Sequence, residues 1–326
     1  MVTIKTWLQL IRWKNILFLA YIVASLFYGV VMPYLAQYHI IPANSGLLFG
    51  LLLGSTVLIA AGGYVINDYF DTKIDEINRP TKVIVGKSVT RAQAAMGFQI
   101  LLGLGVLCGL CLAVLLRDVT IGLIYIVISG LLWFYSSSYK RQLIIGNLMI
   151  AVCAFMSCFM IGYVVNTQLI QTYQSLIYQT PIIIDIYAWT AGFGLFSFLF
   201  TFLREIIKDI DDIEGDREME CHTIPIVWGI GTTKIILMAL TIGILLLTGY
   251  AALAYIPFST DTITLRYYVF GMAIPMLILL CWIGIAKKRS QWQQISQFVK
   301  FIMLIGCSYA LVVYYLYYIN SLPAWC

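Results

Sequence analysis

The sequence predicts an all-α multi-span membrane protein, with nine transmembrane helices in one bundle. Three observations indicate this class. Of the 326 residues, 61% are hydrophobic and only 11% are charged. The mean hydropathy is +0.91, and the apolar residues fall into runs close to the roughly 20 residues that cross a bilayer. No soluble linker interrupts these runs, so we expect a single transmembrane domain over residues 1–326.

Nine apolar runs are the predicted spans. They lie near residues 16–32, 46–66, 94–116, 119–135, 144–165, 187–203, 235–255, 267–286 and 299–319. The first run follows Lys14 without a convincing small-residue cleavage site, so it is predicted to be a retained anchor. The preceding segment, Ile4 to Trp13, mixes basic with large apolar side chains, which is typical of a helix lying in the membrane interface.

The basic residues fall almost entirely on one side of this arrangement. Eighteen of the 20 precede span one or follow spans two, four, six and eight, and only Arg117 and Arg266 do not. The positive-inside rule therefore predicts that the N-terminus and these connections are cytoplasmic and that the C-terminus lies outside, in a cytoplasmic-membrane protein. The net charge of +5 reflects topology, so no nucleic-acid partner is predicted, and no obligate protein partner either.

One acidic pattern, Asp-x-x-Asp-x-x-x-Asp, occurs twice, each time at the end of an apolar run. The aspartates are Asp68, Asp71 and Asp75 and, 141 residues later, Asp209, Asp212 and Asp216. On a helix, the spacings i, i+3 and i+7 place three carboxylates on one face. Four spans separate the copies, so both are predicted on the cytoplasmic side, in a parallel pseudo-repeat of four plus four helices with a ninth added.

Six carboxylates gathered in one place repel one another unless cations neutralise them. Hard divalent cations together with a phosphate ligand are the usual solution. The two acidic patterns, in connections around residues 67–93 and 204–234, therefore predict a shared Mg²⁺-diphosphate site on the cytoplasmic face.

The residues around both patterns resemble the UbiA-type intramembrane prenyltransferase family. The stretch from Asn67 to Asp75 matches the family motif N-D-x-x-D-x-x-x-D, and Asp212 with Asp216 matches its second motif, D-x-x-x-D. The flanking residues are most similar to the digeranylgeranylglyceryl phosphate synthase branch. The resemblance implies Mg²⁺-dependent transfer of a prenyl group, geranylgeranyl for this branch, from its diphosphate to a lipid alcohol such as geranylgeranylglyceryl phosphate.

Two departures from the family pattern leave the acceptor open. The stretch from Asn78 to Lys87 has lost two prolines of the usual Pro-rich sequence, and both Tyr135 and Tyr139 precede the basic pair that a single Tyr normally precedes. Prenylation of an aromatic acid or quinone precursor is therefore the alternative activity.

The resemblance and the chemistry of the residue types together imply roles. The candidate metal ligands are Asn67, Asp68, Asp71, Asp75, Asp209, Asp212 and Asp216. The candidate substrate contacts are Arg79, Lys140 and Arg141 for the diphosphate, and Arg12, Lys14 and Asn15 for an anionic acceptor head group. The candidate catalytic residues are Asn67, Asp71, Tyr135, Tyr139, Lys140 and Asp212. The two tyrosine rings are expected to stabilise the allylic cation, although Arg12 and Lys14 are explained equally well as topology signals.

Three other readings compete with this one. A secondary transporter would carry its acidic residues near the membrane midplane rather than at span ends. A purely structural role for the acids does not explain why the same spacing recurs after four spans. An alcohol phosphotransferase would also use aspartates and Mg²⁺, but the duplicate pattern would be unexplained.

Overall fold

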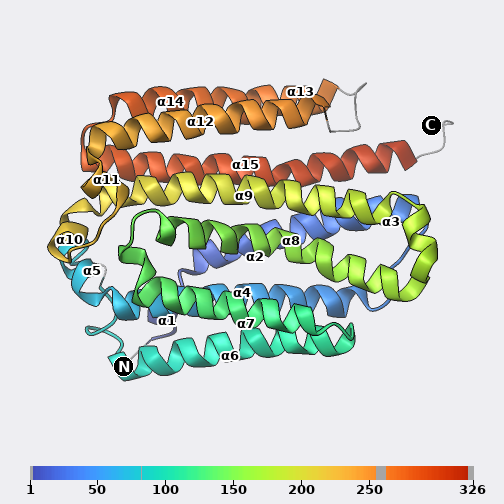
Figure 1. Ribbon diagram of the computed structural model, residues 1–326, viewed down its shortest axis with the longest axis horizontal. Coiled ribbons are helices and arrows are strands. Elements are labelled where there is room, and N and C mark those ends of the chain that lie inside the picture. The colour runs from blue at the N-terminus through green and yellow to red at the C-terminus, as the bar shows by residue number, and fades with distance from the viewer. Residues whose placement is uncertain (1–2, 82, 255–261, 322–326) are drawn as a thin grey trace. The chain divides into compact units, whose positions relative to one another are not determined.

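The structure is a computed structural model that describes residues 3–81, 83–254 and 262–321 (Figure 1). These ranges are helical apart from short connections and an isolated bridge between Val85 and Val89. Nine helices within them are long and apolar enough to cross a membrane. The predicted class and number of spans are therefore confirmed, and the protein is an integral membrane protein. The four-plus-four repeat of whole helices stays a prediction.

The spans are mostly longer than the apolar runs that predicted them. Their bounds are Trp13–Gln37, Ser45–Phe70, Arg91–Leu115, Val119–Ser137, Ile145–Gln179, Ile182–Asp211, Gly229–Ala254, Thr262–Ile285 and Arg289–Tyr317. Span five extends furthest beyond its run, because polar side chains near its end bond to neighbouring backbone. Gln168 donates to the carbonyl of Ala43, and Gln171 donates to that of Leu116.

Two spans contain a π-helical turn just before a proline. In span one, α2 (Trp13–Leu26) leads through η1 (Phe27–Val31) into α3 (Met32–Gln37), which begins at Met32-Pro33. In span eight, α13 (Thr262–Tyr267) leads through η4 (Tyr268–Ala273) into α14 (Ile274–Ile285), which begins at Ile274-Pro275. A proline has no N–H to donate, so the local widening accommodates the missing hydrogen bond.

The chain divides into two compact units. Unit 1 comprises residues 1–140 and 156–194. In it, α4 (Ser45–Phe70), α6 (Arg91–Leu115) and α7 (Val119–Ser137) pack against one another. A Cβ atom on Gly109 of α6 would lie 2.4 Å from the Tyr125 ring of α7. The absence of a side chain at Gly109 therefore sets how closely these two helices approach.

The short helix α1 (Ile4–Leu10) is anchored to the same unit. Thr3 accepts a hydrogen bond from the N–H of Thr6 and so caps its start. Leu10 is fully buried in a cluster that includes Val85 and Val89 from the connection before α6. The opposite side of α1 exposes Ile4 at 81%. Such a helix, apolar on both its inner and outer sides, fits the predicted interfacial position.

Unit 2 comprises residues 141–155 and 195–326. In it, α12 (Gly229–Ala254) packs against α14, and α14 packs against α15 (Arg289–Ser321). Two long helices, α8 (Ile145–Tyr173) and α9 (Ile182–Asp211), have residues in both units. Within unit 2, α9 and α15 touch where a Cβ on Gly306 would lie 2.1 Å from the ring of Phe196.

Candidate active site

The first acidic segment bends at its middle aspartate. Helix α4 ends at Phe70, Asp71 has non-helical dihedral angles (φ −85°, ψ 4°), and α5 (Thr72–Asn78) follows. Backbone hydrogen bonds continue across the break, because the N–H of Asp71 bonds to the carbonyl of Asn67 at 2.9 Å and that of Asp75 bonds to Asp71 at 2.8 Å. The segment is therefore two helices joined at Asp71.

The second acidic segment repeats this break at the same position. Helix α9 ends at Asp211, Asp212 has φ −97° and ψ 6°, and α10 (Ile213–Glu218) follows. The N–H of Asp212 bonds to the carbonyl of Lys208 at 2.9 Å, and that of Asp216 bonds to Asp212 at 3.1 Å. The three aspartates of each copy are therefore distributed over two consecutive helices that are joined at the middle aspartate.

The two predicted connections, around residues 67–93 and 204–234, contain both helical and irregular segments. After α5, a tight turn at Gly86 leads into α6, whose first residue is Arg91. After α10, the short helix α11 (Ile224–Val227) leads into α12. About half of the first range and most of the second are helical, because α4, α9 and the short helices extend into them.

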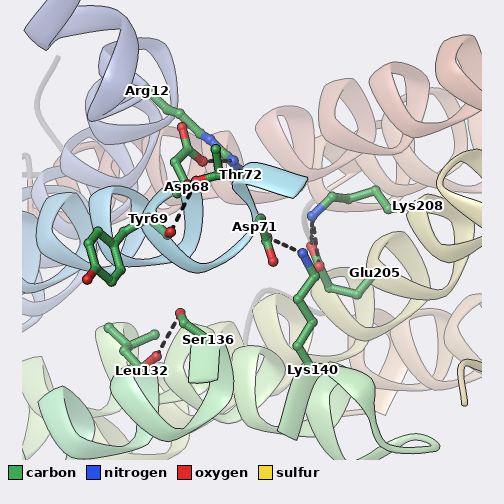
Figure 2. A network of polar contacts seen from close by, with 10 residues as sticks. All are labelled: Arg12, Asp68, Tyr69, Asp71, Thr72, Leu132, Ser136, Lys140, Glu205 and Lys208. Carbon is green, nitrogen blue, oxygen red and sulfur yellow. Dashed lines mark hydrogen bonds and ion pairs between the residues drawn. The ribbon is translucent and has the colours of Figure 1, made fainter. Parts of the chain in front are cut away.

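Basic side chains neutralise the first acidic segment (Figure 2). Arg12 donates from Nη2 to Asp68 Oδ1 at 2.7 Å, and Lys140 forms an ion pair with Asp71. Arg12 adopts the left-handed conformation (φ 53°) between α1 and α2, and its guanidinium lies 5.0 Å from the ring centroid of Tyr64. A non-glycine residue in this conformation is uncommon. Its ion pair and its contact with the Tyr64 ring hold Arg12 there.

Asp75 belongs to the same electrostatic group. It lies in α5, outside the spans, and is half-buried. Burial and then the negative charges of Asp71 and Asp68 raise the pKa of Asp75 to about 6. The three carboxylates of the first segment are therefore close enough to repel one another, as the site hypothesis requires.

The second acidic segment is held by a different set of partners. Asn147 of α8 donates from Nδ2 to Asp209 Oδ2 at 2.8 Å. Glu205, one turn before Asp209, forms an ion pair with Lys208 at 2.8 Å (Figure 2). Asp216 is buried, with 4% of its surface exposed. The segment thus combines buried carboxylates with an amide donor and a lysine.

The structure separates the three candidate head-group contacts near span one. Arg12 reaches the first acidic segment, as described above. Lys14 is exposed, and its Nζ lies 5.8 Å from the ring centroid of Trp13. The N–H of Asn15 bonds to the carbonyl of Arg12 at 2.7 Å, so Asn15 helps to form the turn between α1 and α2. Of the three, Arg12 alone has a described ion pair with a motif aspartate.

The remaining candidates lie on short segments next to the acidic ones. Arg79 ends α5, and its N–H bonds to the carbonyl of Asp75 at 2.8 Å. Tyr139 and Arg141 lie with Lys140 on the single turn η2 (Tyr139–Arg141), and the carbonyl of Arg141 accepts from the N–H of His222 at 2.8 Å.

The two candidate tyrosines differ in their surroundings. Tyr135 is half-buried in the last turn of α7, and the Tyr139 ring lies 6.1 Å from that of Phe134. The choice between Tyr135 and Tyr139 as the cation-stabilising ring stays open.

Sequence reasoning missed several polar residues around the second acidic segment. They are Asn147, Glu205, Asp211, Arg289 and Gln293. Glu205 and Asp211 could have been found, because they are acids within the span end that carries the motif. The other three lie far away in the sequence, and only the fold brings them to the acids.

The donor set fits a hard divalent cation. Every candidate ligand supplies carboxylate or amide oxygen, which is what Mg²⁺ prefers. Within residues 3–81, 83–254 and 262–321, no three His, Cys, Asp or Glu side chains converge closely enough to hold an ion. Basic side chains neutralise the acids instead, as Lys140 does for Asp71. The residues therefore fit Mg²⁺ provided that these basic groups move away from the carboxylates when it binds.

An all-helical membrane protein with two matched aspartate segments is the class that the fold and the site define. The chain belongs to the UbiA prenyltransferase family, whose model matches residues 25–305. The family that the motifs resemble is therefore confirmed.

Among the relatives that the chain matches, the digeranylgeranylglyceryl phosphate synthase of Methanosphaera stadtmanae is 32% identical over 201 residues. This match covers 60% of this chain and 64% of that protein, slightly less than two thirds of its length. The synthase of the same name from Methanopyrus kandleri is 29% identical over 273 residues, covering 81% of this chain and 87% of that protein.

Solved structures share the fold. A structure concerning digeranylgeranylglyceryl phosphate synthase in membranes has a TM-score of 0.59 at 22% identity, covering 96% of this chain and 99% of that chain. A UbiA homologue from Archaeoglobus fulgidus bound to DMAPP and Mg²⁺ has a TM-score of 0.56 at 15% identity, covering 92% and 98%. At these identities, the likeness supports the fold alone.

Proposed function

We propose that this protein transfers a geranylgeranyl group from geranylgeranyl diphosphate to geranylgeranylglyceryl phosphate or a similar lipid alcohol, with Mg²⁺ as cofactor. The observation that supports the transfer chemistry is the matching helix break at Asp71 and Asp212, where the two aspartates have similar backbone dihedral angles. The choice of acceptor is supported by the synthases that the chain resembles over most of its length.

The six motif aspartates and Asn67 would hold the metal. When bound, Mg²⁺ would neutralise the negative charge that accumulates on the departing diphosphate. Lys140 already lies against Asp71, so a small movement of its flexible side chain would let it contact a phosphate oxygen instead. Arg79 and Arg141 would supply further positive charge to the same leaving group.

The bond changes follow from an allylic diphosphate. The C–O bond to the diphosphate breaks, and the bonding pair leaves with the diphosphate. The aromatic ring of Tyr135 or Tyr139 would stabilise the allylic cation through its negative face. The acceptor hydroxyl then forms the new ether bond and loses its proton to the released diphosphate, which acts as the base. Exclusion of water would protect the cation until this capture.

Arg12 is the best-placed candidate for an anionic acceptor head group. Its side chain is one third exposed, and its guanidinium is bonded to Asp68. A guanidinium forms paired hydrogen bonds with phosphate oxygens, so Arg12 would bind a glycerol phosphate more strongly than an uncharged alcohol.

An acceptor screen tests this proposal. Purified protein would be incubated with labelled geranylgeranyl diphosphate, Mg²⁺ and either geranylgeranylglyceryl phosphate or an aromatic acid, with Asp212→Asn as the inactive control. We expect a labelled ether lipid only with the first acceptor. Product on the aromatic acid alone would overturn the proposal that the acceptor is a lipid alcohol. Substrate flux in liposomes without diphosphate release would indicate a transporter.

The proposed orientation places the N-terminus and both acidic segments on the cytoplasmic side. It is supported by the distribution of the basic residues, 18 of which precede span one or follow an even-numbered span. If the C-terminus lies outside, a C-terminal fusion to a reporter that works only outside the cytoplasm should be active. A fusion to a reporter that works only in the cytoplasm should be inactive.

A further inference from the structure

Between its first and last motif aspartates, the second acidic segment carries two acids that the first one lacks. Asp211 and Glu214 correspond, at the 141-residue offset, to Phe70 and Lys73 in the first segment. The three aspartates of the pattern are the same in both copies, so these additional acids are not part of the repeated pattern. The additional acids therefore have a role that the first segment does not share.

Both additional acids bind the start of the ninth span. Asp211 is the last residue of α9, and 6% of its surface is exposed. Its Oδ1 accepts from Arg289 Nε at 3.0 Å and from Gln293 Nε2 at 2.9 Å. Arg289 also reaches Glu214 of α10, at 3.3 Å from Nη1 to Oε2. One arginine therefore contacts the acidic segment on both sides of Asp212.

A second contact shows that α15 accompanies α9 for several turns (Figure 1). A Cβ on Gly306 of α15 would lie 2.1 Å from the ring of Phe196 in α9. Phe196 lies 15 residues before Asp211, and Gly306 lies 13 residues after Gln293. At about 1.5 Å per residue, these stretches are about 22 Å and about 20 Å long. The two helices are thus matched in register and run antiparallel.

We propose that Arg289 and Gln293 are positioning residues for the second acidic segment, and that the ninth span serves to hold the bend at Asp212 in place. The inference rests on the proposed Mg²⁺-diphosphate chemistry of Asp212 and Asp216. The direction of the Asp212 side chain depends on where α9 ends, and the two donors on Asp211 fix that end.

The physical reason is the accuracy that a metal site requires. Ligands must stay within about 0.5 Å of their productive positions, which depends on the residues that support them. Loss of a supporting hydrogen bond typically weakens metal affinity or activity about 10- to 100-fold. Arg289 acts through Asp211 and does not itself touch the reacting atoms, so its effect should appear as a changed metal requirement.

The test uses Arg289→Gln and Gln293→Leu in the full-length purified protein. We expect each to raise the half-saturating Mg²⁺ concentration about 10-fold or more, with kcat largely restored at high Mg²⁺. Binding of Mn²⁺, followed by electron paramagnetic resonance without turnover, should weaken in parallel. Arg289→Lys should recover part of the affinity, because it retains a donor and a positive charge.

Gln291→Ala provides the matched control on the same turn of α15. Gln291 Oε1 accepts from the N–H groups of Lys287 and Lys288 at 2.8 and 2.9 Å, so it supports the helix start without contacting Asp211. We expect this variant to lower thermal stability and leave the Mg²⁺ requirement unchanged. An equal change in the Mg²⁺ requirement for Gln291→Ala and Arg289→Gln would overturn the proposal.

Two results separate this inference from the proposed function. If the wild-type protein binds Mn²⁺ and diphosphate and the Arg289 and Gln293 variants bind them equally well, the positioning role is wrong and the function stands. If the wild-type protein binds neither, the proposed function fails and the positioning role fails with it.

Discussion

Asp71 and Asp212 occupy equivalent backbone positions 141 residues apart. Each directly follows the last residue of a long span, each has a ψ angle close to 5°, and each accepts a backbone hydrogen bond from the aspartate four residues later. This equivalence is the structural basis for expecting that both serve one reaction.

Replacing either residue with asparagine tests that expectation. Asp71→Asn and Asp212→Asn should each lower kcat by about 100-fold or more, because each removes a charge from the metal site. The double variant should be little worse than either single one, since both act on one diphosphate. Steady-state kinetics with prenyl diphosphate would measure this.

Asp118→Asn is the control for these two substitutions. Asp118 caps α7 through a 2.9 Å bond from the N–H of Thr120, and asparagine caps helices equally well. Its kcat should match that of the wild type. Fully additive losses in Asp71→Asn/Asp212→Asn would indicate that the two segments act independently.

The raised pKa of Asp75 predicts a pH-dependent metal requirement. Burial and the charges of Asp71 and Asp68 raise the pKa of Asp75 from its ordinary value of 3.8 to about 6, so the folded protein binds this proton more tightly than the unfolded chain. Its contribution to stability is therefore complete below pH 3.8 and is lost as the pH rises through about 6.

Metal requires the deprotonated carboxylate, so the effect of Mg²⁺ has the opposite sign. The affinity for Mg²⁺ should be about 10-fold weaker at pH 5 than at pH 7.5, if one proton must leave. Isothermal titration calorimetry at both pH values measures this. The Asp75→Asn variant should bind Mg²⁺ more weakly than the wild type at pH 7.5, and its Mg²⁺ affinity should depend much less on pH. If its Mg²⁺ affinity depends on pH as steeply as that of the wild type, the proton belongs to another group.

The ion pair between Arg12 and Asp68 predicts a stability effect that depends on metal. Arg12→Ala leaves a largely buried carboxylate unpaired, and the partial exposure of Arg12 reduces the cost to about 1–3 kcal/mol of unfolding free energy. Mg²⁺ should reduce this deficit by supplying positive charge. Unfolding in mixed micelles, with and without Mg²⁺, measures it.

Lys14→Ala is the matched control for Arg12→Ala. Lys14 is exposed and lies over the neighbouring Trp13 ring, so its loss should change stability by less than about 0.5 kcal/mol. A deficit in Arg12→Ala that Mg²⁺ does not reduce would show that Arg12 acts by packing alone.

The contact between Gly306 and Phe196 predicts a steric effect within unit 2. Gly306→Ala places a methyl group 2.1 Å from the Phe196 ring and should destabilise the protein by about 1–3 kcal/mol. Phe196→Leu in the same chain should recover part of this loss. Gly243→Ala, with no atom within 4 Å of the added Cβ, should leave the melting temperature unchanged or slightly raised.

The sequence was sufficient to predict the fold class and the number of spans. The length of an apolar run such as 46–66 reflects the thickness of the hydrocarbon core that a span crosses. The bounds of α4 were therefore predicted to within a few residues at each end. The ends of α8 and α9 were missed by more, because polar residues continue a helix that hydropathy no longer detects. Span count depends on hydrophobicity, whereas helix length depends on hydrogen bonding.

The candidate site was predicted in part for a similar reason. The acids of each motif are recognisable because they lie close together in the sequence. Lys140 is recognisable for the same reason, because it directly follows Tyr139. The bend at Asp71 was missed, because nothing in residue type distinguishes a continuous helix from one interrupted at a single aspartate. The bond between Asp209 and Asn147 was also missed, because it joins residues 62 positions apart.

The burial of Leu10 beside Val85 and Val89 has a practical consequence for work on this protein. Removing the first ten residues would leave every membrane crossing intact, yet it would uncover the apolar side of the connection that follows Asp75. We expect a shortened protein to insert normally but to have lower activity. Correct insertion alone would therefore not show that a truncated protein is functional.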